Sequence, residues 1–152
     1  MRRLLLKLAI TITVGSLLAL TPTVAQIIPP TKKAERVEIT KGPEIELAID
    51  NLTIIRWTTN NPGGLNDHFG VVYYGTDPKV LSQTAKSPIR LNQAHPYTTF
   101  RVRMQGLKPQ TTYYYKVASE ESNGKSDGVK STVKKFTTPA PGERIVASPK
   151  RD

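Results

Sequence analysis

The sequence predicts an all-β fold, a seven-stranded antiparallel β-sandwich in which two sheets enclose one hydrophobic core. Segments with alternating apolar and polar residues recur along the chain, and turn residues such as Asn, Gly and Pro separate them. No helical periodicity is present after residue 25. The only tryptophan, Trp57, and the run from Tyr113 to Tyr115 supply large rings for the core.

Residues 1–25 are typical of a secretory signal peptide. Basic residues precede an apolar stretch from Leu8 to Leu20, and small residues follow at Thr23-Val24-Ala25. The stretch is shorter than the roughly 20 residues that span a bilayer. We therefore expect a secreted or periplasmic protein, with an uncleaved membrane anchor as the alternative. Residues 26–35 follow as an extended linker.

The composition limits the possible chemistry and partners. The chain contains no cysteine, which excludes disulfides and thiolate metal sites. The net charge of +10 favours an anionic partner such as an envelope polymer, acidic lipid or glycan. An ordinary solubilising surface explains the same charge, and the sequence alone favours that simpler interpretation. Nucleic acid is not expected, because the basic residues are scattered and export removes the usual target.

Three strands are predicted in the first half of the domain, at residues 36–48, 52–59 and 69–76. The first is interrupted at Gly42-Pro43, which we expect at a sheet edge, where proline is tolerated. In the second, Ile55 and Trp57 face the core. In the third, Val72 and Tyr74 point inward.

The second half begins with residues 79–91, for which we expect short edge strands and irregular structure. The strand at residues 97–107 places Phe100 and Val102 on one face and Arg101 and Arg103 on the other. Strands at residues 111–117 and 129–138 follow, joined by a loop with an Asn123-Gly124 turn. Residues 139–152 are expected to be a disordered tail.

The segment from Leu107 to Val117 resembles part of a known family. Its pattern is the L-x-P-x-T-x-Y-x-x-x-V of fibronectin type III domains, in which the tyrosine packs inward and bonds back to the preceding loop. Together with residues 72–76 and 135–138, this segment more closely resembles the N-terminal domain of purple acid phosphatases. The resemblance covers residues 36–138 and implies a fibronectin type III or immunoglobulin-like fold. It also implies that the break at Gly42-Pro43 can turn the first strand towards the other sheet.

The predicted core combines the inward residues of all these strands. Its members are Ile55, Trp57, Val72, Tyr74, Phe100, Val102, Leu107, Tyr113, Tyr115 and Val117.

No catalytic, cofactor or metal site is predicted, and the protein is not expected to be an enzyme. Of the two histidines, His68 follows Asp67 beside a Gly-rich loop and supplies half of a metal site at best. The alternative is a loop-end histidine that is exposed or bonded to backbone. In purple acid phosphatases the metal ligands belong to a larger C-terminal domain, whose motifs are not in this sequence.

One face of the predicted sandwich is a candidate interaction surface. The family topology pairs the strand that starts at Phe69 with the one that starts at Thr111, so their outward residues become neighbours. These residues are Val71, Tyr73, Tyr114 and Lys116. Exposed aromatics beside a cation are typical of interaction surfaces, and cross-strand packing is the alternative. On the other sheet, outward Arg56, Arg101 and Arg103 could be neutralised by Glu38, Glu44 and Glu46.

These observations predict an exported, non-catalytic module for protein–protein or cell-envelope interaction. Two alternatives stay open. One is a stand-alone accessory domain of a purple acid phosphatase-like metallophosphatase. The other is a carbohydrate-binding module.

Overall fold

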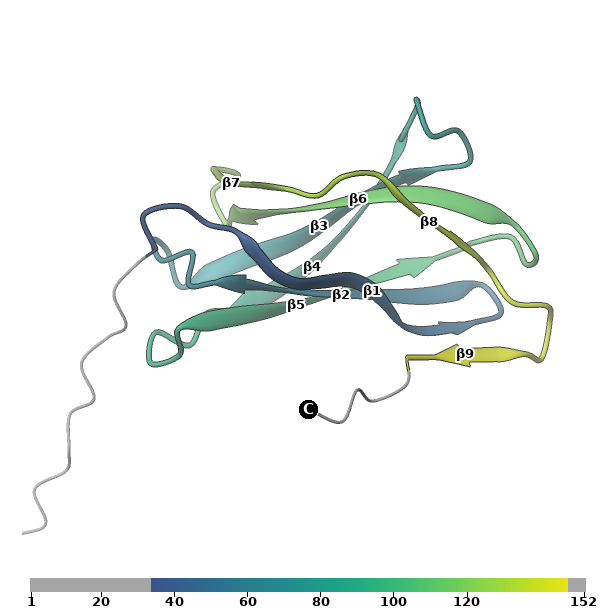
Figure 1. Ribbon diagram of the computed structural model, residues 1–152, viewed down its shortest axis with the longest axis horizontal. Helices are drawn as coiled ribbons and strands as arrows, with labels where there is room; N and C mark the ends of the chain where they lie inside the picture. Colours follow the sequence, from purple (N-terminus) through teal and green to yellow (C-terminus); the bar gives the residue numbers. More distant parts are fainter. Residues whose placement is uncertain (1–33, 148–152) are drawn as a thin grey trace, which may run out of the picture.

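A computed structural model describes residues 34–147, which form two antiparallel sheets packed face to face (Figure 1). The predicted signal peptide, most of the linker and the end of the tail lie outside the described residues. The part of the chain from 34 to 147 contains no helix that could cross a membrane. The strands are β1 Ile39–Ile49, β2 Leu52–Asn60, β3 Asp67–Gly75, β4 Gln83–Arg90, β5 Tyr97–Gln105, β6 Thr112–Glu121, β7 Ser126–Lys130, β8 Lys134–Thr137 and β9 Arg144–Val146.

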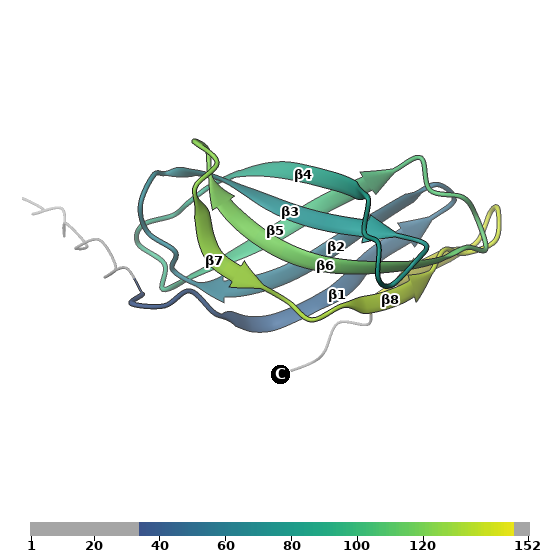
Figure 2. The ribbon, with the colours of Figure 1, turned by 90° about the horizontal axis from the view of Figure 1, so that it is seen from above.

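The sheets differ in size and strand order. One, here called the β1 sheet, has the order β5-β2-β1-β9. The other, the β3 sheet, has the order β4-β3-β6-β7, and β8 also pairs with β6. Figure 2 looks onto the β3 sheet with the β1 sheet behind it. The predicted antiparallel sandwich, a fibronectin type III-like fold, is therefore confirmed.

The described residues form nine strands and not the seven that we predicted. Within residues 79–91, for which we expected short edge strands and irregular structure, residues 83–90 make one regular edge strand, β4. The last predicted strand is divided into β7 and β8, which pair with different halves of β6. The tail, expected to be disordered, adds β9. In the turn before β9, the N–H of Gly142 donates to Asp50 Oδ1 at 2.9 Å. The backbone of β9 pairs with β1.

Strand β1 continues through the predicted break at Gly42-Pro43. It pairs with β2 on both sides of that point, with register shifts that absorb the irregularity, so the chain does not cross to the other sheet. Gly42 has a φ of 81°, and a Cβ there would lie 2.8 Å from the carbonyl oxygen of Arg56. Glycine is therefore needed where the two strands approach closely.

The core lies between the sheets around Trp57, which is 1% exposed. The indole stacks on the ring of Phe100, with centroids 5.2 Å apart and an interplanar angle of 16°. All ten predicted core residues belong to one buried cluster, which also contains Met104 and Phe136. The alternation of residue types along each strand is thus sufficient to identify the buried face.

Side-chain contacts bridge the two sheets at both long edges. Where β4 lies beside β5, the backbone N–H of Arg103 donates to Ser87 Oγ at 3.3 Å. Where β8 lies beside β1, Lys134 Nζ donates to the carbonyl oxygen of Pro43 at 2.9 Å. The outer faces of the two sheets consequently remain as the broad surfaces of the molecule.

Candidate binding faces

The outer face of the β3 sheet brings the predicted interaction residues together. Tyr73 lies directly opposite Lys116, whose Nζ is 5.5 Å from the centroid of the tyrosine ring. Tyr114 lies on β6 one position further along the same face, opposite Gly75. These three residues are half-buried, so part of each side chain remains at the surface.

Val71 departs from the prediction. It occupies an outward position of β3, between Lys86 of β4 and Ala118 of β6, yet it is 0% exposed. An ion pair between Lys86 Nζ and Glu120 Oε1, 2.5 Å apart, joins the strands on either side of β3. Long side chains from the two neighbouring strands therefore enclose the small valine, and Val71 cannot contact a partner.

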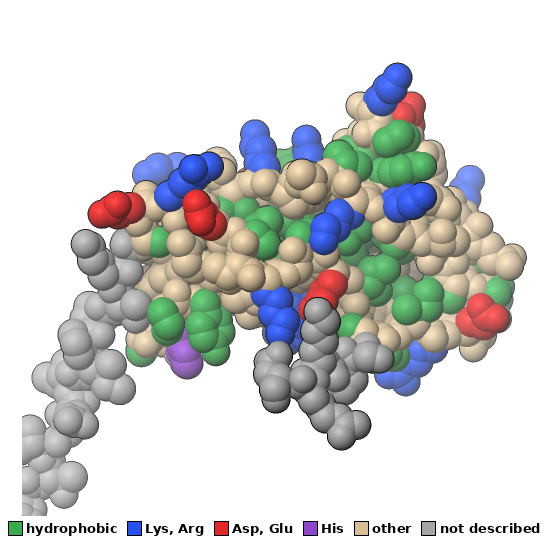
Figure 3. Space-filling model, viewed as in Figure 1, with side chains coloured by type: hydrophobic (Ala, Val, Ile, Leu, Met, Phe, Trp, Pro, Cys, Tyr) green, Lys and Arg blue, Asp and Glu red, His purple; other side chains and the backbone are tan. Residues whose placement is uncertain are grey.

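Basic side chains predominate on this face. The strand register places outward Lys86, Arg90, Lys116, Lys130 and Lys135 on it. The same register places two acidic residues outward, Asp67 opposite Arg90 and Glu120 within reach of Lys86. The hydrogen bond to Glu120 raises the pKa of Lys86, which favours the charged form of the lysine. Figure 3 shows basic side chains along the upper margin, above β6 and β8. The face therefore carries an excess of positive charge.

An open groove of about 570 Å³ adjoins the basic face. It is lined by Pro78, Tyr114, Val133, Lys134 and Lys135. Val133 is 46% exposed, and Val80 in the loop before β4 is 58% exposed. Apolar surface and lysine ammonium groups thus meet at Tyr114. Of the groove residues, only Tyr114 was among the predicted interaction residues.

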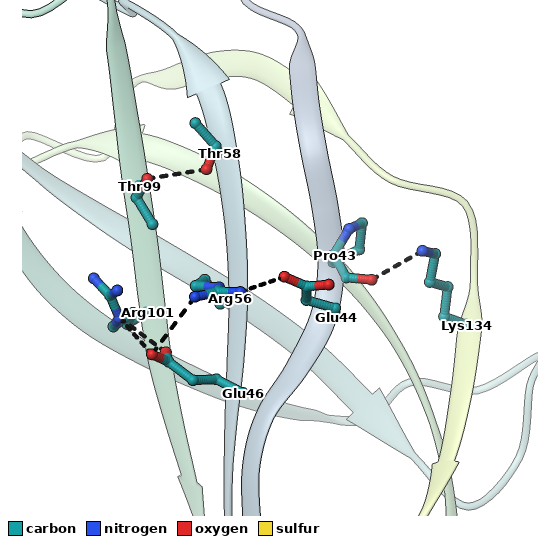
Figure 4. Close-up of polar contacts among 8 residues, drawn as sticks. All are labelled: Pro43, Glu44, Glu46, Arg56, Thr58, Thr99, Arg101 and Lys134. Carbon is teal, nitrogen blue, oxygen red and sulfur yellow. Dashed lines mark hydrogen bonds and ion pairs between the residues drawn. The ribbon is translucent and has the colours of Figure 1, made fainter. Parts of the chain in front are cut away.

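On the outer face of the β1 sheet, two arginines form ion pairs with carboxylates. Arg56 donates to Glu44 Oε1 at 2.6 Å, and Arg101 Nε lies 2.8 Å from Glu46 Oε2 (Figure 4). Arg56 also lies 3.9 Å from Glu46. The hydrogen bond that Arg56 donates to Glu44 is the largest of the effects that raise the pKa of Arg56. The predicted neutralisation by Glu44 and Glu46 is confirmed for Arg56 and Arg101. It is wrong for Arg103, which forms no ion pair with the residues that the structure describes, and Glu38 pairs with Arg36 instead.

His68 is neither exposed nor bonded to backbone through its ring, in contrast to the alternative that we favoured. Its side chain is buried, and Nε2 lies 3.2 Å from Oδ1 of Asp127, whose side chain is only 4% exposed. Asp127 belongs to β7, and the β3-β6-β7 order brings it close to His68. Sequence reasoning missed Asp127 because the two residues are 59 positions apart. Within residues 34–147, no group of three or more metal-ligating side chains is present.

His95 lies in a turn, as predicted. Its backbone N–H donates to the carbonyl oxygen of Asn92 at 3.0 Å. Its ring packs edge-on against Tyr97, with centroids 5.7 Å apart. Tyr97 is 52% exposed on the outer face of the β1 sheet.

Comparison with known proteins gives a family and several similar folds. Residues 46–138 match the model of the purple acid phosphatase N-terminal domain. The sensor domain of the anti-sigma factor RsgI4 from Pseudobacteroides cellulosolvens, in its short form, is 21% identical with a TM-score of 0.48, over 71% of this chain and 99% of that one. The fn3 domain of human contactin 1 is 14% identical with a TM-score of 0.37, over 86% and 96% of the two chains. No curated protein is similar enough to this chain to match it.

Proposed function

The chain belongs to the family of purple acid phosphatase N-terminal domains, and from that premise we propose that it is an exported, non-catalytic module that binds an anionic polymer of the cell envelope. The binding surface is the outer face of the β3 sheet together with its adjoining groove. The family match covers the sandwich from β1 to β8 and corresponds to an accessory domain, which supports a binding role over a catalytic one.

The single observation that carries this proposal is the difference in ion pairing between the two outer faces. Arg56 and Arg101 on the β1 sheet have carboxylates within 2.6 to 2.8 Å. On the β3 sheet, outward Arg90, Lys116, Lys130 and Lys135 have no ion pair with a described residue, and only Lys86 is paired, with Glu120. A basic surface with little internal compensation attracts anionic groups. Tyr73 and Tyr114 add ring surface beside Lys116, and aromatic residues are enriched in the central parts of interfaces.

Retention of the purified protein on beads bearing polygalacturonate tests this proposal, with beads bearing a neutral polysaccharide for comparison. We expect retention on the anionic beads that decreases as salt rises, because salt screens exposed charges beyond a Debye length of about 8 Å at physiological ionic strength. Replacing Lys116 and Lys135 by glutamine should weaken retention at least tenfold. The matched control removes the same number of charges from the opposite sheet, as Lys41→Gln and Arg103→Gln.

Two outcomes would overturn the proposal. One is equal retention of the two charge variants, which would make binding a property of net charge alone. The other is failure of the wild-type protein to bind the anionic beads. The double variant Tyr73→Ser and Tyr114→Ser should lose binding but remain folded, so that its thermal unfolding stays cooperative. If it fails to fold, these rings stiffen the sheet and do not form the binding surface.

A second function follows from the family match itself. The module could assist a separately encoded metallophosphatase catalytic chain, since the matching family is the N-terminal domain of such enzymes. A phosphatase assay of candidate catalytic chains, with and without this protein, separates the two functions. A change in phosphatase activity upon addition of the module would favour the second.

A further inference from the structure

The outer face of the β1 sheet contains a second groove, which the proposed function does not use. Its volume is about 390 Å³, and it crosses β1, β2 and β5. The lining residues are Thr40, Lys41, Arg56, Thr58, Tyr97, Thr99 and Arg101. The strand register arranges outward side chains in successive rows, one of which is Lys41, Thr58 and Thr99, and the next Glu44, Arg56 and Arg101.

The row of Glu44, Arg56 and Arg101, together with Glu46 beside it, supplies hydrogen-bond donors and acceptors side by side. Arg101 Nε contacts both carboxylate oxygens of Glu46, at 3.1 and 2.8 Å, which fixes the plane of the guanidinium. Each arginine has five N–H donors, and each carboxylate has several lone-pair sites, so both groups retain capacity for a ligand. Because carboxylates line the same row, a bound anion would experience repulsion. A ligand that both donates and accepts fits this row better.

The row of Lys41, Thr58 and Thr99 presents hydroxyl groups. Thr58 Oγ1 and Thr99 Oγ1 lie 2.9 Å apart, and Thr40 Oγ1 donates to the carbonyl oxygen of Thr58 at 3.3 Å. A hydroxyl group has one donor and two acceptor positions, so these bonds do not saturate the threonines. Figure 4 shows the Thr58–Thr99 pair on the same face as the Arg–Glu pairs, further along β2 and β5.

An aromatic ring stands at the end of the groove. Tyr97 is 52% exposed, and its edge-on contact with His95 restricts the ring's orientation. Tyr97 precedes Arg101 by four residues on β5, which corresponds to about 13 Å along an antiparallel strand. The groove therefore offers a flat apolar ring, then hydroxyls, then paired charges, over a length that suits a short run of sugar rings.

We propose that this groove binds a neutral polysaccharide. The apolar C–H face of one sugar ring stacks on Tyr97, and hydroxyl groups of that ring and the next exchange hydrogen bonds with Thr58 and Thr99. A further sugar hydroxyl bonds to the Arg101–Glu46 pair. The inference concerns a different face and a ligand of different charge from the proposed function, so either can fail while the other holds.

Beads bearing neutral polysaccharides test the proposal, with dextran, laminarin, galactomannan and arabinoxylan as the probes. We expect the purified protein to be retained by at least one of them, with little dependence on salt because no net charge is neutralised. Tyr97→Ala should weaken that retention at least tenfold, and Arg101→Ala severalfold. Both residues are exposed, so thermal unfolding of each variant should stay close to that of the wild type.

The matched control lies on the outer face of the β3 sheet. Tyr73→Ser should leave retention by the neutral polysaccharide unchanged, whereas loss of retention in that variant would move the site to the β3 sheet. Retention that survives Tyr97→Ala would overturn the proposal. So would retention by none of the four neutral polymers. Binding of polygalacturonate alone, sensitive to Lys116→Gln, would support the proposed function and exclude the neutral site.

Discussion

The backbone N–H of Lys108 donates a 3.0 Å hydrogen bond to the hydroxyl of Tyr113, five residues later in the chain. The tyrosine ring is buried and stacks on Phe136 of β8, with centroids 5.8 Å apart. The loop between β5 and β6, here called the tyrosine corner, is also bonded to Thr138, whose hydroxyl donates to the carbonyl oxygen of Lys108 at 2.6 Å. The loop before β6 is thereby attached to the core and to the end of β8.

Tyr113→Phe should reduce the free energy of unfolding by about 1 kcal/mol, because the Lys108 N–H loses its acceptor while the ring stays packed. Urea unfolding monitored by tryptophan fluorescence measures this change. Tyr97→Phe, which removes a hydroxyl from an exposed ring, is the matched control and should be nearly neutral. Equal stability of the two variants would show that the corner hydrogen bond contributes nothing.

Gly70→Ala should destabilise the protein by about 1–3 kcal/mol through overpacking. A Cβ at this position would lie 2.9 Å from Val102 Cγ2 and 3.0 Å from Cη2 of Trp57. Adding Trp57→Phe replaces the indole by a smaller single ring that does not reach the position of Cη2. The two substitutions should then be non-additive, because they share one contact. Thermal unfolding of the four proteins completes the cycle. Strict additivity would contradict a steric conflict at Gly70.

His68→Leu should cost about 3–5 kcal/mol, because it leaves the buried carboxylate of Asp127 without its partner. Replacing both residues by leucine should recover part of this loss, since no unpaired charge then remains in the interior. Denaturant unfolding of the two single variants and the double variant gives the coupling energy. A coupling near zero would mean that the 3.2 Å contact does not stabilise the fold.

Stability should fall as the pH rises from about 10 to about 12. Burial is the main cause that raises the pKa of Tyr115 to about 12, above the ordinary tyrosine pKa of 10.0 that applies in the unfolded chain. Between these values the unfolded state releases a proton that the folded state retains, so rising pH favours unfolding. The effect amounts to roughly 3 kcal/mol for two pKa units.

Urea midpoints measured across this pH range check the prediction, with Tyr115→Phe as the control. Burial also raises the pKa of Tyr74, so the variant should keep a shallower decline and not become independent of pH. An unchanged pH profile in Tyr115→Phe would contradict the assignment to Tyr115.

Sequence reasoning succeeded where the determining pattern is local. Alternation along each strand identified the inward residues of β2, β3 and β5, and the L-x-P-x-T-x-Y spacing located the corner at Tyr113. Sequence reasoning was less successful for the strands at the edges of the sheets. Strand β9 has three exposed side chains, so no apolar pattern indicates it, and its pairing depends on the free edge of β1.

The candidate faces were only partly predictable for a related reason. The sequence indicated which side chains point outward, and the neighbours of Arg56 followed from the first hairpin. The burial of Val71 depends on side chains from β4 and β6, which the strand order places on either side of it. The contact between His68 and Asp127 and the excess of lysines on one face depend on the same long-range order.

The sequence by itself determined the fold class, the core and the position of the tyrosine corner, because side-chain direction in a strand alternates with every residue and hydrophobic burial selects one face. Only the tertiary structure decided which of the candidate ion pairs form, which outward residues are enclosed and which two faces remain open. Those properties arise from the register between strands distant in the chain, since electrostatic and packing interactions act through space and not along the sequence.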